Sequence, residues 1–256
     1  MNIKVLGAHN RESRNTKYMS LLIDGVLALD AGGLTSTLSF RAQQKIKAIL
    51  LTHHHYDHIR DVPAIAMNFY FWNEKINIYC GKSTYEAIAN HLLNDDLYPN
   101  FMTRPKDNPT VRFTILEPLQ PIKIEDYEIL AVPLNHSVPA TGYQITSPAG
   151  KAIFYTGDTG PGLKGAWQYI SSQILFIEVT APNRFDEFAR RAGHLTPSLL
   201  KQELADFRAV KGYLPQVVAV HNNPGSEKDT ESELAVVARD LSCDITLAYE
   251  GMQIKL

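Results

Sequence analysis

Short apolar runs, many alternating with polar residues, dominate the first half of the 256-residue chain and predict strands and hairpins. In the second half, strand-like runs alternate with segments of helical period, such as 197–210 and 231–241. No linker-like stretch separates the halves. We therefore expect one domain over residues 1–256, with mixed sheets covered by helices in an α+β or α/β sandwich.

The pattern assigns most of the chain to elements. An Asp-Gly pair at 24–25, between two strand-like runs, is typical of a two-residue hairpin. Ser83 is expected to cap a helix that follows it. Strands are predicted near Ile3 and Val5 and at 18–23, 26–30, 46–51, 76–80, 111–116, 122–124, 127–132, 143–146, 151–155, 174–179, 217–220, 245–247 and 253–256. Helices are predicted at 36–44, 62–70, 83–93, 166–171, 184–190, 197–210 and 231–241.

The densest polar cluster reads His-His-His-Tyr-Asp-His at residues 53–58, directly after a buried-looking apolar run. In an extended turn, alternate side chains share a face, so His53, His55 and Asp57 can project together, and His58 joins them as a helix begins. Imidazole and carboxylate are ligands that zinc, manganese and iron accept. A purification tag or a solvated loop is the competing interpretation, but a tag would lie at a terminus.

Other polar residues also follow predicted strands. His136, Asp158 and His221 each stand at a strand-to-loop junction. A lone histidine there is usually structural, but strand ends on one edge of a sandwich converge, so together these residues favour one metal site. Asp30 ends the strand at 26–30, where it can reach that site from behind or simply form a turn.

The order His-x-His-x-Asp-His, followed by the three later residues, resembles the metallo-β-lactamase family of hydrolases. The resemblance implies a four-layer αββα sandwich with the site at one edge of its two sheets. It also implies two divalent metal ions, with zinc expected and manganese or iron as alternatives. It would place His53, His55 and His136 on one ion, Asp57, His58 and His221 on the other, Asp158 between them, Asp30 as a carboxylate supporting a ligand loop, and His54 and Tyr56 pointing away.

A second motif, Ala-Gly-His-Leu-Thr-Pro at 192–197, narrows the reaction. It opens a predicted helix, whose first amide groups form an anion site, so His194 and Thr196 could hold a phosphate. Simple capping by Thr196 is the alternative, and capping and phosphate binding are compatible. The motif looks like the phosphodiesterase branch of the family, which contains ribonuclease Z and the class II cyclic-nucleotide phosphodiesterases. In that branch a histidine here assists phosphate-ester cleavage.

The resemblance therefore implies a metal-dependent phosphodiesterase with catalytic roles for Asp57, Asp158 and His194. The metal pair would generate hydroxide near neutral pH, and His194 would stabilise the phosphoryl group or protonate the leaving oxygen. A cyclic nucleotide or a small nucleic-acid-type ester is the expected substrate. Transfer-RNA 3′ processing is an alternative, but the net charge of −2 and the lack of a Gly- and Lys-rich arm do not favour RNA.

Three other functional hypotheses rely on the same metal-site residues. A lactonase or thioesterase would cleave a carbonyl ester at this metal site. Residues 94–110, with Tyr98 and Phe101, would then wall the substrate pocket, unless this loop packs onto its own domain. A redox di-iron site is less favoured because relatives that react with oxygen generally replace a histidine of the run with glutamate. A non-enzymatic sensor would bind its ligand without turnover.

The cysteines, the N-terminal residues and the lengths of the apolar runs indicate the cellular environment to expect. Cys80 and Cys243 are the only cysteines and are far apart, so neither a disulfide framework nor a thiolate zinc site is expected. The chain shows no signal-peptide pattern and no apolar run long enough to span a membrane. A cytoplasmic protein without membrane contact is expected, and a homodimer is compatible with these features.

Overall fold

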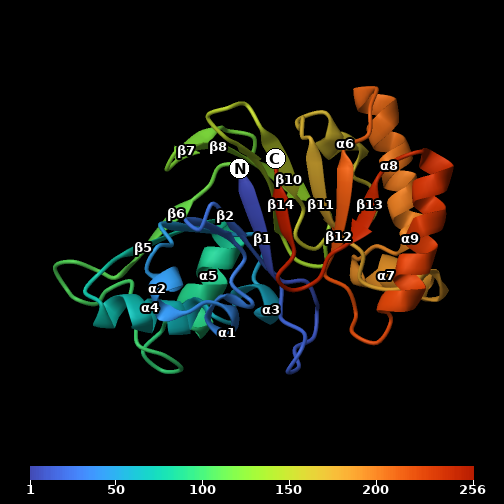
Figure 1. Ribbon diagram of the computed structural model, residues 1–256. Helices are drawn as coiled ribbons and strands as arrows, with labels where there is room; N and C mark the ends of the chain where they lie inside the picture. Colours follow the sequence, from blue (N-terminus) through green and yellow to red (C-terminus); the bar gives the residue numbers. More distant parts are fainter.

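A computed structural model, which describes residues 1–256, shows two seven-stranded mixed sheets packed face to face and covered on their outer sides by helices (Figure 1). The expected αββα metallo-β-lactamase sandwich is thus confirmed. Central strands such as those at 48–51 and 174–178 are buried on both faces, because each sheet packs against its partner on one side and against helices on the other.

The first sheet joins both ends of the chain. Its first strands are antiparallel, and from β3 onward neighbours are parallel. In the hairpin between β2 and β3, Asp24 and Gly25 have positive φ angles of 49° and 75°, as the Asp-Gly pair predicts. In spatial order the strands are β14 (Gln253–Lys255), β1 (Asn2–Gly7), β2 (Ser20–Ile23), β3 (Leu27–Leu29), β4 (Ala48–Leu51), β5 (Ile76–Cys80) and β6 (Val111–Ile115).

The second sheet repeats this plan. Its spatial order is β13 (Ile245–Leu247), β12 (Gln216–Val220), β11 (Ile174–Glu178), β10 (Ala152–Tyr155), β9 (Ala140–Thr146), β8 (Tyr127–Leu134) and β7 (Ile122–Ile124). Strands β10 to β13 are parallel, while β9 is antiparallel to both β8 and β10. Strands β8, β10, β11 and β12 therefore run in one direction and end at the same edge.

Helices cover each sheet on one side only. On the first sheet lie α1 (Leu34–Thr37), α2 (Phe40–Gln43), α3 (Tyr56–Ile59), α4 (Val62–Phe71) and α5 (Lys82–His91) (Figure 1). On the second lie α6 (Lys164–Trp167), α7 (Asp186–Ala192), α8 (Pro197–Lys211) and α9 (Glu227–Leu241), with a 3₁₀ turn, η1 (Asn183–Phe185), before α7. No helix has the length and apolar character needed to cross a bilayer.

Three helix predictions need correction, and one of them, the helix expected over 166–171, is instead the short α6 at Lys164–Trp167. The single helix expected over 36–44 is two short helices, because Leu38 is extended (φ −100°, ψ 136°) and Ser39 begins a new helix by accepting a hydrogen bond from the amide of Ala42. Ser83 does not cap α5, which begins at Lys82 after Gly81. In the sequence, a serine inside the first turn of a helix looks the same as a serine at the capping position. Only the backbone conformation shows where the helix begins.

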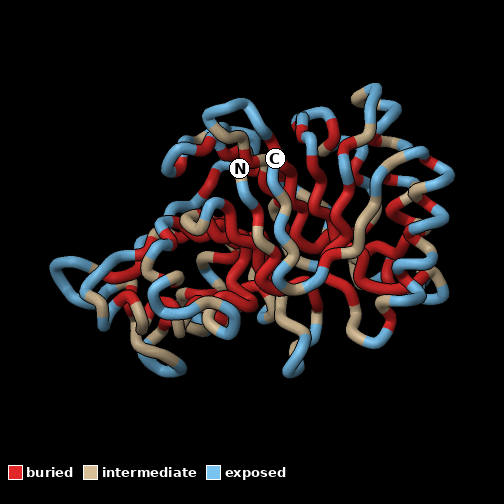
Figure 2. The backbone as a smooth tube through the Cα atoms, in the orientation of Figure 1, coloured by how far each residue is buried: buried red, intermediate tan, exposed pale blue.

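The apolar core has three layers, which follow from the alternation of side chains along each strand. In β4, Ala48 and Leu50 face the space between the sheets, while Ile49 and Leu51 face the helices. Figure 2 shows the buried backbone concentrated along the strands and the exposed residues at loops and outer helix faces. Burial of each large apolar side chain contributes about 1.5–3 kcal/mol, so this packing holds the strand ends in fixed positions.

Candidate metal centre

The polar residues predicted at strand ends meet at one edge of the sandwich. His53 lies two residues after β4, His136 two residues after β8 and His221 directly after β12. Asp158 follows β10. The parallel arrangement brings these ends together from both sheets. The predicted ligand residues form two clusters, His53, His55, His136 and Asp158 in one and Asp57, His58, Asp158 and His221 in the other.

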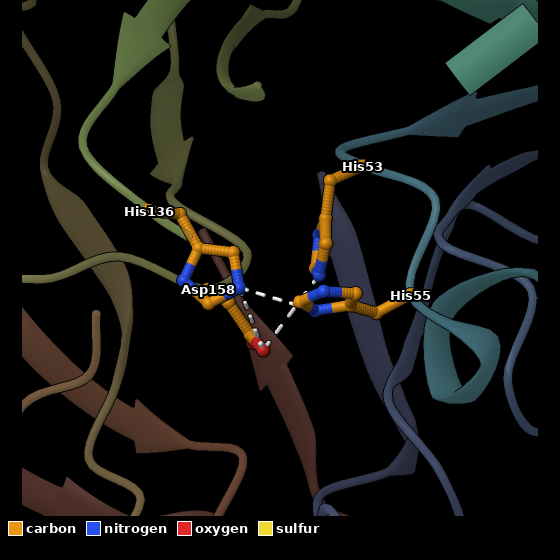
Figure 3. Close-up of side chains that lie close together, drawn as sticks. All are labelled: His53, His55, His136 and Asp158. Carbon is orange, nitrogen blue, oxygen red and sulfur yellow. Dashed lines mark hydrogen bonds and ion pairs between the residues drawn. The ribbon is translucent and has the colours of Figure 1, made fainter. Parts of the chain in front are cut away.

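Figure 3 shows the first cluster, in which three imidazole rings and one carboxylate point toward a common centre. Asp158 Oδ2 lies 3.8 Å from His53 Nε2 and 4.0 Å from His136 Nε2. His136 Nε2 lies 3.2 Å from His55 Nδ1. The first sheet provides His53 and His55, and the second provides the other two residues, so the cluster exists only when the sheets are packed.

The second cluster shares Asp158 with the first. Asp158 Oδ1 lies 3.2 Å from His58 Nε2, and its Oδ2 lies 3.4 Å from His221 Nε2. Asp57 Oδ2 lies 3.1 Å from His221 Nε2. The extended turn expected to carry Asp57 is instead the start of α3, so the helical turn directs Asp57 and His58 to the site. The carboxylate of Asp158 thus faces the histidines of both clusters.

Outer hydrogen bonds orient the imidazole rings. His58 Nδ1 donates to Asp30 at 2.8 Å, and His136 Nδ1 donates to the carbonyl of Gly193 at 2.7 Å. The Thr180 hydroxyl donates to a carboxylate at 2.7 Å, so it accepts from His221 Nδ1 at 2.9 Å. In each ring, the bonded Nδ1 leaves the Nε2 lone pair free to face the cluster, the arrangement that metal-ligating histidines favour.

Asp30 supports the site from behind, as the resemblance implies. It is fully buried and accepts hydrogen bonds from the amide of Thr52 at 2.8 Å and from the hydroxyl of Tyr155 at 2.6 Å. The hydroxyl oxygen of Thr52 in turn lies 3.0 Å from His53 Nδ1. This carboxylate therefore positions a histidine of each cluster, one directly and one through Thr52.

The donor set suits divalent cations. Inside the clusters, His53 Nε2, His58 Nε2 and Asp158 Oδ1 are buried and have no hydrogen-bond partner. Unsatisfied buried polar atoms are unfavourable by themselves, and a cation would satisfy all three. Five imidazoles and two carboxylates are ligands that zinc, manganese and iron accept. The residues present therefore fit one divalent cation in each cluster.

Electrostatics favour the ligand-competent forms of His53, His136 and Asp57. Burial, with the neighbouring His58, holds the pKa of His53 well below its ordinary value. Burial also lowers the pKa of His136, against the opposing field of Asp158. Burial would raise the pKa of Asp57, but the field of His58 and contact with His221 outweigh it and lower this pKa to about 2. His58 is the exception: burial would lower its pKa, but the carboxylates of Asp158 and Asp30 outweigh burial and raise this pKa well above its ordinary value. Neutral imidazole and ionised carboxylate are the forms that bind metal.

Gly157 permits the close approach of the two sheets at this edge. Its φ angle is 60°, in the left-handed region, and a Cβ atom there would lie 2.6 Å from the side chain of Thr52. Thr52 belongs to the hydrogen-bond network of Asp30. A glycine is thus required here for both its backbone angle and its lack of a side chain.

Glu178 is a site residue that the sequence reasoning missed. It is fully buried at the end of β11, and its Oε1 accepts from His194 Nδ1 at 2.6 Å. Its Oε2 accepts from the Thr180 hydroxyl. Glu178, His194 and His221 form a third cluster beside the other two. The signal was present, because Glu178 is a polar residue that ends an apolar strand, as Asp30 does in the first sheet.

The start of α8, where His194 and Thr196 are expected to hold a phosphate, has its Thr196 hydroxyl and first amide groups engaged within the protein. Thr196 is fully buried; its hydroxyl donates to Asp186 and caps the helix by accepting from the amide of Leu199. Asn183 accepts from the amide of Ser198, and Pro197 has no N–H. Thr196 therefore caps α8, and the contacts of Asn183 and Thr196 occupy the amides of Ser198 and Leu199. His194 is held by Glu178 rather than by the helix.

The loop at 94–110 also differs from its expected role as a pocket wall. Phe101 is only 2 % exposed and packs in the core between the first sheet and its helices. Its ring centroid lies 5.2 Å from that of Tyr70 in α4. Tyr98 packs against the same core. The structure therefore does not bring Tyr98 or Phe101 to the candidate metal centre, and the loop packs onto its own side of the molecule.

The sequence is similar to that of ribonuclease Z proteins. It is 30 % identical over 140 residues to ribonuclease Z of Thermococcus onnurineus, covering 52 % of this chain and 42 % of that protein. It is 28 % identical over 189 residues to ribonuclease Z of Thermococcus kodakarensis, covering 67 % of this chain and 57 % of that protein. The alignments thus span about half the length of these relatives.

Solved structures share the fold over nearly the whole chain. Unliganded yeast PDE1 has a TM-score of 0.87 and 16 % identity, covering 100 % of this chain and 99 % of that one. The short form of human tRNase Z has a TM-score of 0.70 and 20 % identity, with 100 % and 99 % covered. Residues 20–221 match the family described as the beta-lactamase superfamily domain. The paired histidine–aspartate clusters therefore lie in a protein that belongs to the beta-lactamase superfamily.

Proposed function

We propose that this protein is a metal-dependent hydrolase that cleaves a small phosphodiester, most simply a nucleotide ester. The observation that carries the proposal is the pair of buried Glu178 and half-buried His194, which places a proton-bearing imidazole beside the two histidine–aspartate clusters. The similarity to ribonuclease Z over half the chain supports phosphorus as the centre attacked.

His53, His55 and His136 would hold one ion, Asp57, His58 and His221 the other, and Asp158 would contact both. Zinc is the first choice. When bound, the ions would supply a nucleophile from water near neutral pH and neutralise charge on the phosphoryl oxygens. The carboxylates of Asp57 and Asp158 would neutralise only part of the positive charge of two divalent ions. The remaining positive charge favours an anionic substrate.

His194 is suited to protonate the leaving oxygen or to neutralise a phosphoryl oxygen. Burial would lower its pKa, but the charge and hydrogen bond of Glu178 outweigh burial and raise the pKa to about 9. In the protein without bound metal, the imidazolium is then the main form at neutral pH. Nδ1 donates to Glu178, so Nε2 carries the proton that is available to substrate.

A small nucleotide ester is favoured over transfer RNA. The formal charge of −2 does not favour a large nucleic-acid surface, which usually carries a basic surplus.

The test combines metal analysis of the purified protein with turnover of bis-p-nitrophenyl phosphate, cyclic nucleotides, precursor transfer RNA and a lactone. We expect phosphodiester turnover in the metal-loaded protein. His194→Ala should retain its metal and lose about 10²–10⁴-fold in kcat if it is the proton donor. His55→Ala should lose metal. His54→Ala is the matched control, because His54 belongs to the same run but to neither cluster.

Two results would count against the proposal. Metal-loaded protein that cleaves the lactone but no phosphodiester would indicate a carbonyl-ester hydrolase. Full phosphodiesterase activity in His194→Ala, with its metal content unchanged, would remove the role of His194 while leaving the metal centre in place.

A further inference from the structure

Two tyrosines of the second sheet form hydrogen bonds with the first sheet beside the metal centre. The hydroxyl of Tyr143 in β9 donates to the carbonyl of Leu51 at 2.7 Å. The hydroxyl of Tyr155 in β10 donates to Asp30 at 2.6 Å. Leu51 is the last residue of β4, two positions before His53, and Asp30 directly follows β3. Both hydrogen bonds therefore end where the first sheet delivers its metal ligands.

The two tyrosines form a pair within the second sheet. They lie directly opposite each other in the antiparallel ladder of β9 and β10, so their side chains leave the same face. Both are fully buried in the apolar core between the sheets. A phenylalanine would fill the same space, whereas a buried hydroxyl is unfavourable unless it finds a hydrogen-bond partner. Burial raises the pKa of both phenols well above the ordinary value, so both keep the proton that they donate.

A backbone contact shows how closely the sheets approach at this edge. The amide of Thr141 in β9 donates to the carbonyl of Thr52, which follows β4 of the other sheet, at 3.0 Å. Stacked sheets are usually about 10 Å apart, so a backbone hydrogen bond between them marks a local convergence. Figure 3 shows two histidines of the first sheet facing a histidine and Asp158 of the second. The distance between the sheets at this edge therefore sets the distances within the cluster.

Each tyrosine supports a ligand of a different cluster. Asp30 Oδ2 accepts from the hydroxyl of Tyr155 and from His58 Nδ1, at 2.6 and 2.8 Å. Tyr155 thus holds the oxygen to which the ring of His58 donates. Tyr143 holds the backbone carbonyl two residues before His53. One hydroxyl therefore acts on each of the two predicted ion sites.

We propose that Tyr143 and Tyr155 are positioning residues of the metal centre. They tie the second sheet to the strand ends of the first and thereby set the spacing of the ligands that hold the two ions. They act through Leu51 and Asp30 rather than by contact with an ion. This inference rests on the metal centre of the proposed function, but it does not depend on the reaction, because it concerns metal binding alone.

The chain offers a matched control at the opposite edge of the sandwich. Tyr127 begins β8, is 6 % exposed, and donates through its hydroxyl to Asp24 in the hairpin between β2 and β3. It therefore also joins the two sheets through a tyrosine hydroxyl. Strand β8 runs from this edge toward His136, and β3 runs from the same edge toward Asp30. The length of these strands separates Tyr127 from the metal centre.

The experiment compares Tyr143→Phe, Tyr155→Phe and Tyr127→Phe. Zinc affinity is measured by competition with a chromogenic chelator, and stability by urea unfolding of the metal-free proteins. The first two variants should bind zinc about 10- to 100-fold more weakly than the native protein, the range for groups that orient metal ligands. Tyr127→Phe should bind zinc as the native protein does, although it also loses a hydrogen bond between the sheets.

A spectrum separates positioning from a general loss of stability. The visible absorption of bound Co²⁺ depends on the number and geometry of its ligands. In the cobalt-loaded protein this absorption should change in Tyr143→Phe and Tyr155→Phe and stay unchanged in Tyr127→Phe. If Tyr155→Phe does not fold, because it removes a donor from the buried Asp30, Tyr143→Phe decides the question, since its hydroxyl donates only to a backbone carbonyl.

The failure of this inference and the failure of the proposed function give different results. Native zinc affinity and native cobalt absorption in Tyr143→Phe and Tyr155→Phe would overturn the inference. An equal loss of affinity in Tyr127→Phe would also overturn it, because the effect would then not belong to this edge. Native protein that binds no zinc would overturn the metal centre and the inference together. The expected affinities in a protein that cleaves no phosphodiester would refute the reaction and leave the role of the tyrosines intact.

Discussion

Replacing Gly157 with alanine tests how the close packing of the two sheets supports the metal centre. The new Cβ atom would lie 2.6 Å from Thr52 Cβ and Oγ1, so Thr52 must move. Thr52 donates to Asp30 from its amide at 2.8 Å and from its hydroxyl at 3.0 Å, and it accepts from His53. The left-handed backbone costs about 1–2 kcal/mol for a non-glycine residue. Each buried group left unsatisfied costs about 1–3 kcal/mol more.

The expected loss is on the order of 3–6 kcal/mol in the free energy of unfolding, together with weaker metal binding. Urea unfolding and metal analysis of the folded fraction measure the two effects. Gly150→Ala is the matched control: φ is 72° there, but no atom lies within 4 Å of the new Cβ. It should show only the backbone penalty and keep its metal. Equal losses of stability in the two variants, with metal retained in both, would refute the reasoning.

Three further predictions follow from the site and the core. Asp30→Asn should reduce metal affinity by about 10- to 100-fold, because it weakens the support of His58 and Thr52; competition with a chromogenic chelator measures this, and unchanged affinity would contradict it. Removal of metal with a chelator should lower the thermal unfolding midpoint, and zinc should restore it, because only the folded state assembles the clusters; an unchanged midpoint would argue against bound ions. Burial raises the pKa of the Cys80 thiol from 9.0 to about 12. The unfolded thiol ionises at lower pH than the folded one, so Cys80 should reduce stability as the pH rises from 9 toward 12, and it should resist alkylation at pH 8 until the protein unfolds. A Cys80→Ala variant with the same alkaline stability profile would show that this thiol is not the cause.

The strands were largely predictable because each is short, apolar and bounded by turn residues. The parallel ones, such as β4 and β11, are buried on both faces and appear as continuous apolar runs. Short helices were less predictable. A four-residue helix spans barely one turn, so the backbone at Leu38 could divide the predicted helix at 36–44 without any change in the apolar pattern.

Some site residues could likewise be predicted from the sequence and others could not. The ligand-type residues at 53–58 and at the later strand ends could be identified because histidine and aspartate at such positions have few structural explanations, and the structure brings them together. Glu178 was missed although it satisfies the same rule. For Thr196, capping and phosphate binding have the same sequence context, and only the structure shows that its hydroxyl contacts Asp186 and the amide of Leu199.

By itself, the sequence determined the local chemistry of this protein: which residue types follow each strand, and which segments are apolar enough to be buried. These depend on neighbours along the chain. Only the tertiary structure decided that Glu178 holds His194 and that Tyr143 donates to Leu51, and it supplied the distances by which Asp158 faces both clusters. Those relations join residues from different strands and both sheets, and their distances depend on the direction of the strands and the packing between layers, which no local pattern records.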